Sequence, residues 1–307
     1  MSTPNPPRTV LLDGGMGREL RFRGIEVSNT IWSANALLVA PEVVRRIHLD
    51  YILAGADIIT TNTYGLVRAY LAMEGIEHRF ADLNEFACAL ALEAREIAGR
   101  QGMNRPISIA GSLPPLRGSY RPDLVGEFKE IYPLYREQAD LLAPHVDLLL
   151  CETMSSAREA RAAARAACRT GKPVWVSWTL HEDRSGNLRS GEPLSDAFAA
   201  IADLPISGVL SNCCAPESIT NAMPRLVETG VEYIGGYANT VRPIPRHWEL
   251  NGNKKTDGVF ELRQDLDPKS YAGHAATWLK EGATVVGGCC GTGPAHIAEL
   301  RSLINRI

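Results

Sequence analysis

Short apolar runs, each followed by a helical pattern, recur along the whole chain and constrain its fold more than any other feature. The runs are rich in β-branched and aliphatic residues, and each ends in a small or polar residue. Apolar runs that do not alternate with polar residues are typical of parallel strands covered on both faces. We find eight such runs, at residues 9–13, 57–61, 107–111, 147–151, 174–178, 208–212, 233–237 and 284–288.

The stretches between the runs have apolar residues at spacings of three and four, which predicts amphipathic helices. Clear examples are residues 41–56, 124–143, 155–168 and 268–283. Eight strand–helix units in 307 residues predict an α/β fold, a (β/α)8 TIM barrel. A doubly wound open sheet is the alternative, because it uses the same local units.

No Ser-, Pro- or Gly-rich linker divides the chain, so we expect residues 1–307 to form a single barrel domain. Two connections are long. Residues 65–105 are expected to hold more than one helix, and residues 239–268 to form a polar loop.

Charge and hydropathy exclude several classes of partner. The formal net charge is −3 without a basic stripe, so neither nucleic acid nor an anionic membrane surface is expected as a partner. No apolar stretch approaches the roughly 20 residues of a membrane span. The opening residues MSTPNPPRTVLL lack the pattern of a secretory signal, so we expect a cytoplasmic protein. The sequence leaves open whether the protein forms a homo-oligomer.

Polar residues gather where the predicted strands end, which is where TIM barrels carry their chemistry. We therefore expect the polar residues at the strand ends to supply the side chains of one site. The candidates are Asp13, Thr61, Asn62, Ser112, Glu152 and Asn239.

Four of the seven cysteines follow predicted strand ends as two adjacent pairs. A disulfide between neighbouring cysteines strains the peptide that joins them, so each pair is a poor disulfide candidate. A redox switch, a pair of small core residues and a metal site are the other interpretations. The pairs are Cys213 with Cys214 and Cys289 with Cys290, whereas Cys88, Cys151 and Cys168 are expected to pack in the core.

A metal site accounts best for the two pairs. The sixth and eighth strands lie two apart in a closed barrel, so side chains at their ends can converge. Zinc favours thiolates, and catalytic zinc sites use three protein ligands and one open position. Cys213, Cys289 and Cys290 form that set, and Cys214 is expected to be a packing residue. The glycines around residues 289–290 allow the backbone to turn close to an ion.

Six short motifs resemble those of the homocysteine S-methyltransferase family, in the family's order and over nearly the whole chain. The resemblance implies a zinc-dependent (β/α)8 enzyme that methylates the sulfur of L-homocysteine to give methionine. The motifs are DGGMG at 13–17, TNTY at 61–64, GS at 111–112, ET at 152–153, NC at 212–213 and GGCCGT at 287–292.

The resemblance also implies roles for single residues. Cys213, Cys289 and Cys290 would bind zinc, while Asp13 and Glu152 would hold the amino group of homocysteine. The backbone of Gly14 and Gly15 would approach its carboxylate. Positions near the substrates would be Thr61, Asn62, Ser112 and Asn239.

The methyl donor is expected to be a small cation. Residues 237–243 and 111–123 depart from the family pattern where the donor should lie, so its identity stays open. S-methylmethionine or S-adenosylmethionine is favoured over a betaine or another sulfonium. Aromatic rings attract such cations, and the candidates are Tyr64, Trp178, Tyr237 and Trp248.

Other functions remain alternatives at this point. The chain could accept its methyl group from a corrinoid partner protein, or methylate another thiol or selenol. A protein that senses metal or oxidant with vicinal thiols is an alternative from a different class. A zinc hydrolase is disfavoured, because such barrels prefer His and Asp ligands and the strand ends carry no histidine.

Overall fold

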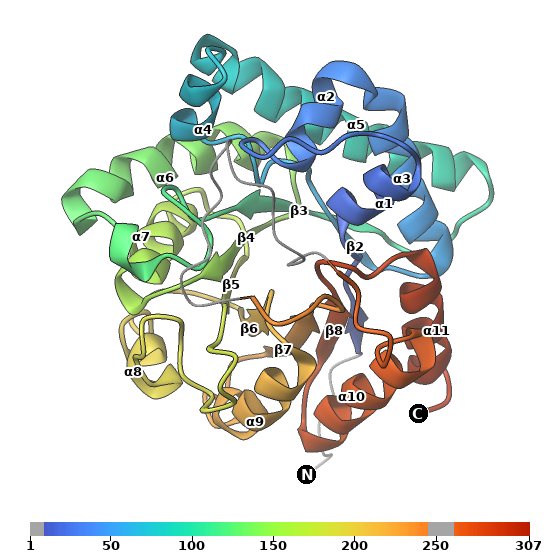
Figure 1. The fold of residues 1–307 in the computed structure, drawn as a ribbon, viewed down its shortest axis with the longest axis vertical. Helices are drawn as coiled ribbons and strands as arrows, with labels where there is room; N and C mark the ends of the chain where they lie inside the picture. Colours follow the sequence, from blue (N-terminus) through green and yellow to red (C-terminus); the bar gives the residue numbers. More distant parts are fainter. Residues whose placement is uncertain (1–8, 245–260) are drawn as a thin grey trace.

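The computed structural model describes residues 9–244 and 261–307, and in this part of the chain eight parallel strands form one sheet (Figure 1). Their spatial order is β1-β8-β7-β6-β5-β4-β3-β2. The strands are β1 (Val10–Leu11), β2 (Ile58–Thr60), β3 (Ser108–Leu113), β4 (Leu148–Met154), β5 (Val174–Trp178), β6 (Gly208–Asn212), β7 (Tyr233–Ala238) and β8 (Val285–Gly288).

The ends of this sheet meet. Leu12 forms a parallel bridge with Ile58, and the Asp57 amide donates to the Leu11 carbonyl at 2.7 Å, which brings β1 beside β2. The prediction of a (β/α)8 barrel is therefore confirmed, and the doubly wound alternative is excluded. Each predicted run overlaps one strand; β5 and β6 coincide with their runs, whereas β3, β4 and β7 extend beyond theirs.

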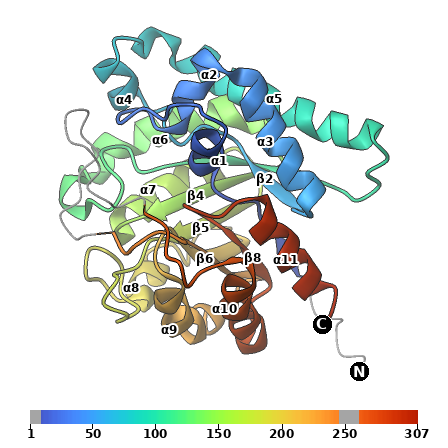
Figure 2. The same cartoon turned by 45° about the vertical axis from the view of Figure 1, so that its right-hand side comes forward.

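Helices surround the barrel, as the two views in Figures 1 and 2 show. Residues 65–105 contain two of them, as expected. The helices are α1 (Met16–Phe22), α2 (Ala36–Val39), α3 (Pro41–Ala54), α4 (Arg68–Met73), α5 (Phe80–Arg100), α6 (Phe128–Leu142), α7 (Ala157–Cys168), α8 (Leu194–Ala199), α9 (Pro216–Val227), α10 (Pro268–Glu281) and α11 (Pro294–Ile304).

Local sequence explains where several helices begin and end. At α7 the Ser156 hydroxyl accepts the Glu159 amide, and at α10 the Asp267 carboxylate accepts the Ser270 amide. Such N-caps satisfy amides that have no partner inside the helix. Gly282 ends α10 with a φ of 116°, a left-handed conformation that glycine adopts without a steric penalty.

The apolar core has two parts. The larger one lies between strands and helices. The smaller one fills the barrel interior, where Trp175 leaves so little room that a side chain at Gly208 would come within 2.5 Å of its ring. The interior core consists of Leu12, Ile58, Ala110, Leu148, Leu150, Trp175, Leu210, Tyr237 and Val285.

The 239–268 connection is partly described. Val241 and Leu262 form an antiparallel bridge that joins its two ends, and the rest of the predicted loop lies outside the described residues. In residues 9–244 and 261–307, no helix combines the length and the apolar character that crossing a membrane requires.

Candidate active site

A cavity of about 430 Å³ lies where the strands end and is lined by residues at the ends of seven of them or in the segments that follow. Polar, aromatic and sulfur-bearing side chains share its wall, so the cavity combines hydrogen-bonding groups with apolar surface. Its lining includes Asp13, Gly14, Gly15, Thr61, Asn62, Glu152, Cys213, Cys289 and Cys290, together with the aromatic residues Trp32, Tyr64, Tyr120 and Tyr237.

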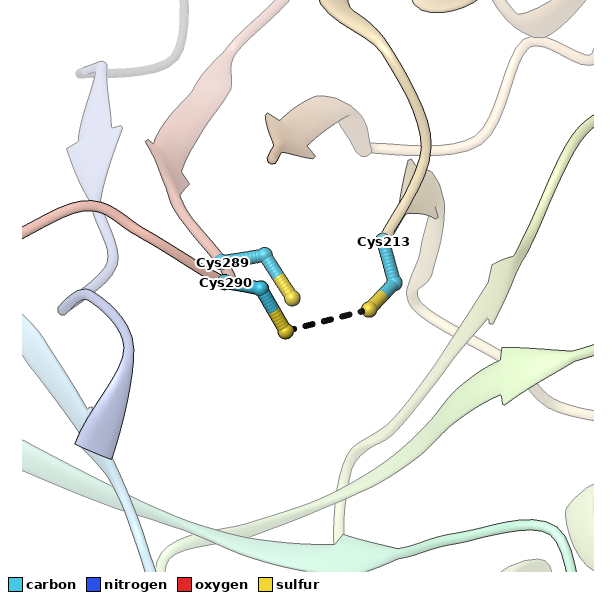
Figure 3. A group of neighbouring side chains, drawn as sticks. All are labelled: Cys213, Cys289 and Cys290. Carbon is cyan, nitrogen blue, oxygen red and sulfur yellow. Dashed lines mark hydrogen bonds between the residues drawn. The ribbon is translucent and has the colours of Figure 1, made fainter. Parts of the chain in front are cut away.

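Three cysteine sulfurs meet at this cavity (Figure 3). The Sγ atoms of Cys213, Cys289 and Cys290 all lie within 4.8 Å of one another, and those of Cys213 and Cys290 are 3.8 Å apart. Cys213 follows β6 and the other two follow β8, with β7 between them. Within the described ranges these three are the group of Cys, His, Asp or Glu side chains close enough to share a metal ion, and Cys214 is fully buried outside it.

The sulfur geometry fits zinc. Tetrahedral zinc with bonds of about 2.3 Å to sulfur places its ligand sulfurs about 3.8 Å apart. The Cys213–Cys290 separation equals that value.

Electrostatics also favour a cation at the cluster. Hydrogen bonds from the thiols of Cys213 and Cys289 lower the pKa of Cys290 well below its ordinary value. Hydrogen bonds with the thiols of Cys213, which has the largest effect, and of Cys290 raise the pKa of Cys289 well above its ordinary value. The cluster therefore holds one thiolate readily, whereas three adjacent thiolates need a positive ion between them.

The backbone at Cys213 has an unusual conformation. Its φ is 56°, and Thr153, at the end of β4, has a φ of 61°. Asn212 links the two, because its Oδ1 accepts the Thr153 amide and its Nδ2 donates to Thr153 Oγ1, both at 2.9 Å. Left-handed backbone outside glycine is costly and occurs often at functional sites. The left-handed backbone at Cys213 directs its side chain toward the other two sulfurs (Figure 3).

Neighbouring strand ends support the two adjacent cysteines. The Asn239 side-chain carbonyl accepts the Cys290 amide at 3.1 Å. Gly15 lies so close to the Cys289 carbonyl that a Cβ at this position would be 2.6 Å from its oxygen. The Gly15 amide donates to the carbonyl and hydroxyl oxygens of Thr292, at 3.2 and 3.3 Å.

Two buried carboxyl groups share the cavity with the sulfurs. Burial raises the pKa of Asp13 and of Glu152 to about 7. Thr60 donates its amide and hydroxyl to Asp13 at 2.8 and 3.1 Å, and Glu152 accepts the hydroxyls of Ser112 at 2.5 Å and Tyr237 at 3.2 Å. A cation beside these carboxyls would favour their ionised forms.

The family model for homocysteine S-methyltransferase matches residues 10–304, nearly the whole chain. The chain belongs to this family.

Known homocysteine S-methyltransferases resemble it over nearly their full length. One from Escherichia coli (strain K12) is 31% identical, across 98% of this chain and 99% of the relative. Homocysteine S-methyltransferase YbgG of Bacillus subtilis (strain 168) is 28% identical, across 95% of this chain and 93% of the relative. The solved structure of the metallated homocysteine methyltransferase MmuM from Escherichia coli is similar with a TM-score of 0.81 at 30% identity, covering 96% of each chain.

Four of the candidate residues in this homocysteine S-methyltransferase family member make their polar contacts with protein groups. Asn62 exchanges hydrogen bonds with Ser33 at 2.6 and 3.0 Å, and the Thr61 hydroxyl pairs with that of Thr63 at 2.9 Å. Ser112 bonds to Glu152 and Asn239 to Cys290. Ser112 thus orients the Glu152 side chain, and Asn239 holds the Cys290 backbone.

The aromatic candidates differ in position. Tyr64 and Tyr237 line the cavity, whereas Trp178 is fully buried in the core between strands and helices. Trp248 lies outside the described residues.

Sequence reasoning missed Tyr120, whose hydroxyl lies 2.8 Å from Cys213 Sγ. Burial raises the pKa of this phenol well above its ordinary value, so the hydroxyl keeps its proton. Tyr120 belongs to the segment 111–123 that departs from the family pattern, and this departure was the available signal.

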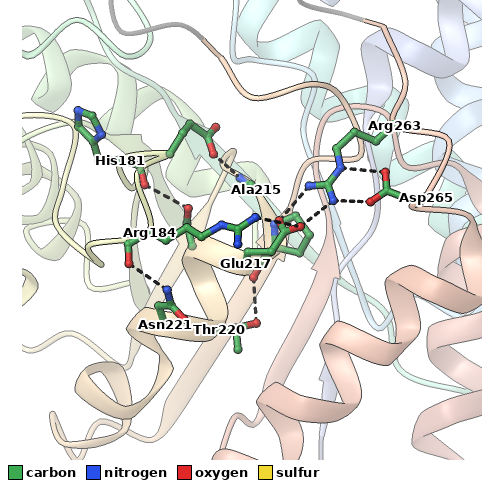
Figure 4. Close-up of polar contacts among 11 residues, drawn as sticks. His181, Arg184, Ala215, Glu217, Thr220, Asn221, Arg263 and Asp265 are labelled. Carbon is green, nitrogen blue, oxygen red and sulfur yellow. Dashed lines mark hydrogen bonds and ion pairs between the residues drawn. The ribbon is translucent and has the colours of Figure 1, made fainter.

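A cluster of ion pairs joins the segments after β5 and β7 to the beginning of α9 (Figure 4). Arg263 donates to both Glu217 oxygens at 2.9 and 2.6 Å and also pairs with Asp265. Arg184 approaches Glu217 at 3.9 Å from the segment after β5. The cluster anchors residues 261–267 against the beginning of α9.

Proposed function

We propose that this family member transfers a methyl group from a small cationic donor to the thiol of L-homocysteine and so produces methionine. The observation that carries the proposal is the group of three sulfurs in one cavity with two buried carboxyl groups. The sulfurs would hold the metal, the carboxyl groups would bind the amino acid, and the aromatic part of the cavity wall would face the donor.

Zinc would be held by Cys213, Cys289 and Cys290. The sulfur spacing and the charge of three thiolates support this assignment, and the related MmuM protein has been solved in a metallated form. When bound, zinc would stabilise the homocysteine sulfur as a thiolate at neutral pH, where a free thiol with a pKa of about 8.5 is mostly protonated.

Asp13 and Glu152 would bind the ammonium group of homocysteine. Their raised pKa values indicate that burial makes two negative charges costly at this position. A positive charge between the cysteines and the carboxyls would offset that cost. Ser112, Thr60 and Tyr237 would keep the carboxyls oriented through the hydrogen bonds described above.

The donor would be S-methylmethionine or S-adenosylmethionine. A sulfonium becomes neutral as its methyl group leaves, so its leaving group needs no proton from a general acid. Tyr64, Tyr237 and Trp32 supply aromatic surface for such a cation in the cavity wall. In-line alignment of acceptor sulfur, methyl and leaving group would then be the main catalytic task.

The decisive experiment is a donor panel with zinc-loaded protein and homocysteine, with methionine as the measured product. We expect methionine with S-methylmethionine or S-adenosylmethionine, and a lower rate with glycine betaine. If no small donor yields methionine from protein with stoichiometric zinc, the proposal fails and a corrinoid partner becomes the better explanation.

Cys213→Ala and Cys214→Ala form a matched pair for the metal assignment. We expect Cys213→Ala to lose zinc and activity because it removes one of three ligands. Cys214→Ala should keep both, since this neighbouring side chain is buried outside the cluster. Zinc content by atomic emission, beside circular dichroism to verify folding, distinguishes the two; a zinc-replete, active Cys213→Ala protein contradicts the assignment.

A further inference from the structure

We propose that Tyr120 is a positioning residue that protects the Cys213 sulfur from methylation and so directs the methyl group to the acceptor thiol. The inference rests on the proposed function, because it concerns the sulfurs that would surround zinc. It assigns a task to a hydroxyl that the chemistry of transfer itself does not use.

The cluster creates a selectivity problem. Three cysteine thiolates would lie beside the acceptor thiolate, and each has a lone pair that can attack a methyl cation donor. In such an attack a new S–CH3 bond forms while the bond from methyl to the leaving group breaks, and the leaving group departs with that electron pair. Methylation of a cysteine would remove a metal ligand, so the protein needs a difference in nucleophilicity between its own sulfurs and the acceptor.

Tyr120 can supply that difference at Cys213. Its oxygen is 2.8 Å from Cys213 Sγ. With zinc bound, Cys213 would be a thiolate without a proton, so the Tyr120 hydroxyl would be the donor. A hydrogen bond to a metal-ligating sulfur occupies a lone pair and withdraws electron density from it. In residues 9–244 and 261–307, the other donor side chain that reaches the cluster from outside it is Asn212, whose Nδ2 is 4.0 Å from Cys289 Sγ.

A buried cation sits against the same tyrosine. The Arg189 guanidinium carbon lies 4.9 Å from the centre of the Tyr120 ring, and the Arg189 side chain is 2% exposed. Glu182 holds this arginine at 3.3 Å, and the Ile244 carbonyl accepts from it at 3.0 Å. A cation over the ring draws electron density from the phenol, which makes the hydroxyl a stronger donor toward sulfur.

The backbone keeps Tyr120 in place. Its φ is 65°, a backbone conformation that residues other than glycine rarely adopt, and the Tyr120 side chain is 4% exposed. The segment after β3 therefore supplies the hydroxyl, and the segment after β5 supplies Glu182 and Arg189. Two separate loops thus converge on the sulfur of Cys213, which follows β6.

Alkylation of zinc-loaded protein by iodomethane, without homocysteine, tests the inference directly. Peptide mass spectrometry would follow S-methylation at each cysteine over time. We expect Tyr120→Phe to be methylated at Cys213 several-fold faster than the unmodified protein, with Cys289 and Cys290 little changed. Equal rates at Cys213 in the two proteins would overturn the inference.

Tyr70→Phe is the matched control. The Tyr70 hydroxyl is buried on α4 and has no hydrogen-bond partner among the described residues, so its removal tests the loss of a buried tyrosine oxygen alone. We expect its alkylation rates to match those of the unmodified protein. An increase at Cys213 equal to that of Tyr120→Phe would overturn the inference as well.

Cobalt(II) substitution gives a second readout that a purely structural role would not change. Loss of a hydrogen bond makes a thiolate a better electron donor, so the sulfur-to-cobalt charge-transfer band should move to lower energy in Tyr120→Phe. An unshifted band contradicts the inference. The double variant Glu182→Gln/Arg189→Gln removes the ion pair without a net change of charge and should shift the band in the same direction by less, which provides the test if Tyr120→Phe does not fold.

These measurements use neither homocysteine nor a natural donor. A protein that gives no methionine in the donor panel but shows faster alkylation of Cys213 in Tyr120→Phe would contradict the proposed function alone. Methionine production with unchanged alkylation rates would contradict the Tyr120 inference alone.

Discussion

At the scale of single residues, the approach of Gly15 to the Cys289 carbonyl links the first strand end to the last. A Cβ at Gly15 would stand 2.6 Å from that oxygen, and backbone atoms cannot yield as a flexible side chain does. The residue therefore controls where the two adjacent cysteines lie.

We expect Gly15→Ala to lower zinc affinity by about tenfold or more, because overpacking of this kind costs about 1–3 kcal/mol. Competition with a chelating dye measures the change. Gly273→Ala is the control, since a Cβ there meets nothing within 4 Å inside α10. It should leave zinc affinity unchanged and add about 0.5–1 kcal/mol to the free energy of unfolding; unaltered affinity in Gly15→Ala would refute this role.

We expect His48 to make the free energy of unfolding depend on pH. It is fully buried on α3, neither ring nitrogen has a hydrogen-bond partner among the described residues, and burial lowers its pKa from 6.5 to about 4. Between these values the unfolded chain binds a proton that the folded chain excludes. The contribution of His48 to the free energy of unfolding is thus fully present above pH 6.5 and is lost as the pH drops toward 4.

His48→Met should flatten this dependence by on the order of 2 kcal/mol between pH 7 and pH 4. Urea unfolding at several pH values measures it, and His78→Met, at an exposed position, is the control. A variant as acid-sensitive as the unmodified protein would show that other groups cause the loss.

At the scale of elements, Asp57 fastens the closure of the barrel at the end opposite the cavity. Its carboxylate accepts the Leu11 amide at 2.9 Å and pairs with Arg105 at 3.0 Å and Arg301 at 2.5 Å. One side chain thereby connects β1, the beginning of β2 and α11.

We expect Asp57→Ala to destabilise the protein by about 3–5 kcal/mol, because it removes the carboxylate that two largely buried guanidinium groups share. Asp265→Ala is the comparison, since Asp265 is 67% exposed and its loss should cost less than about 1 kcal/mol. Zinc content should stay unchanged in both variants. Equal midpoints of urea unfolding for the two would argue against a clamp at Asp57.

At the scale of the whole molecule, the proposed metal site joins the ends of β6 and β8, but the apolar cores lie elsewhere. The interior core and the outer core involve every strand and do not depend on an ion. The fold and the metal site should therefore separate experimentally.

Removal of metal with a chelator should lower the Tm by about 5–10 °C while the far-UV circular dichroism at 25 °C stays the same. A ligand that binds only the folded state stabilises it by about 4 kcal/mol at 1,000 times its Kd, and in a chain of this size that is a modest shift. Addition of zinc should restore the Tm. Loss of helical signal on chelation would mean that the ion holds the barrel together.

Sequence alone determined the barrel and the three converging cysteines, because both follow from local patterns and from the way parallel strands align. Each apolar run became a strand, and the run 147–151 was short of its strand because β4 continues to Met154 through the polar residues of the ET motif. The order of strands around a barrel then brings Cys213 and Cys289 to one end without knowledge of any loop.

Only the tertiary structure decided which groups surround those cysteines. Tyr120 and Cys213 are 93 residues apart, and Gly15 and Thr292 are 277 apart, and no spacing in the sequence indicates either contact. Ser112 and Asn239 belong to the expected set of residues, but their partners, Glu152 and Cys290, emerged only from the fold. The physical reason is that strands repeat a simple apolar pattern, whereas loop conformation depends on packing against distant segments.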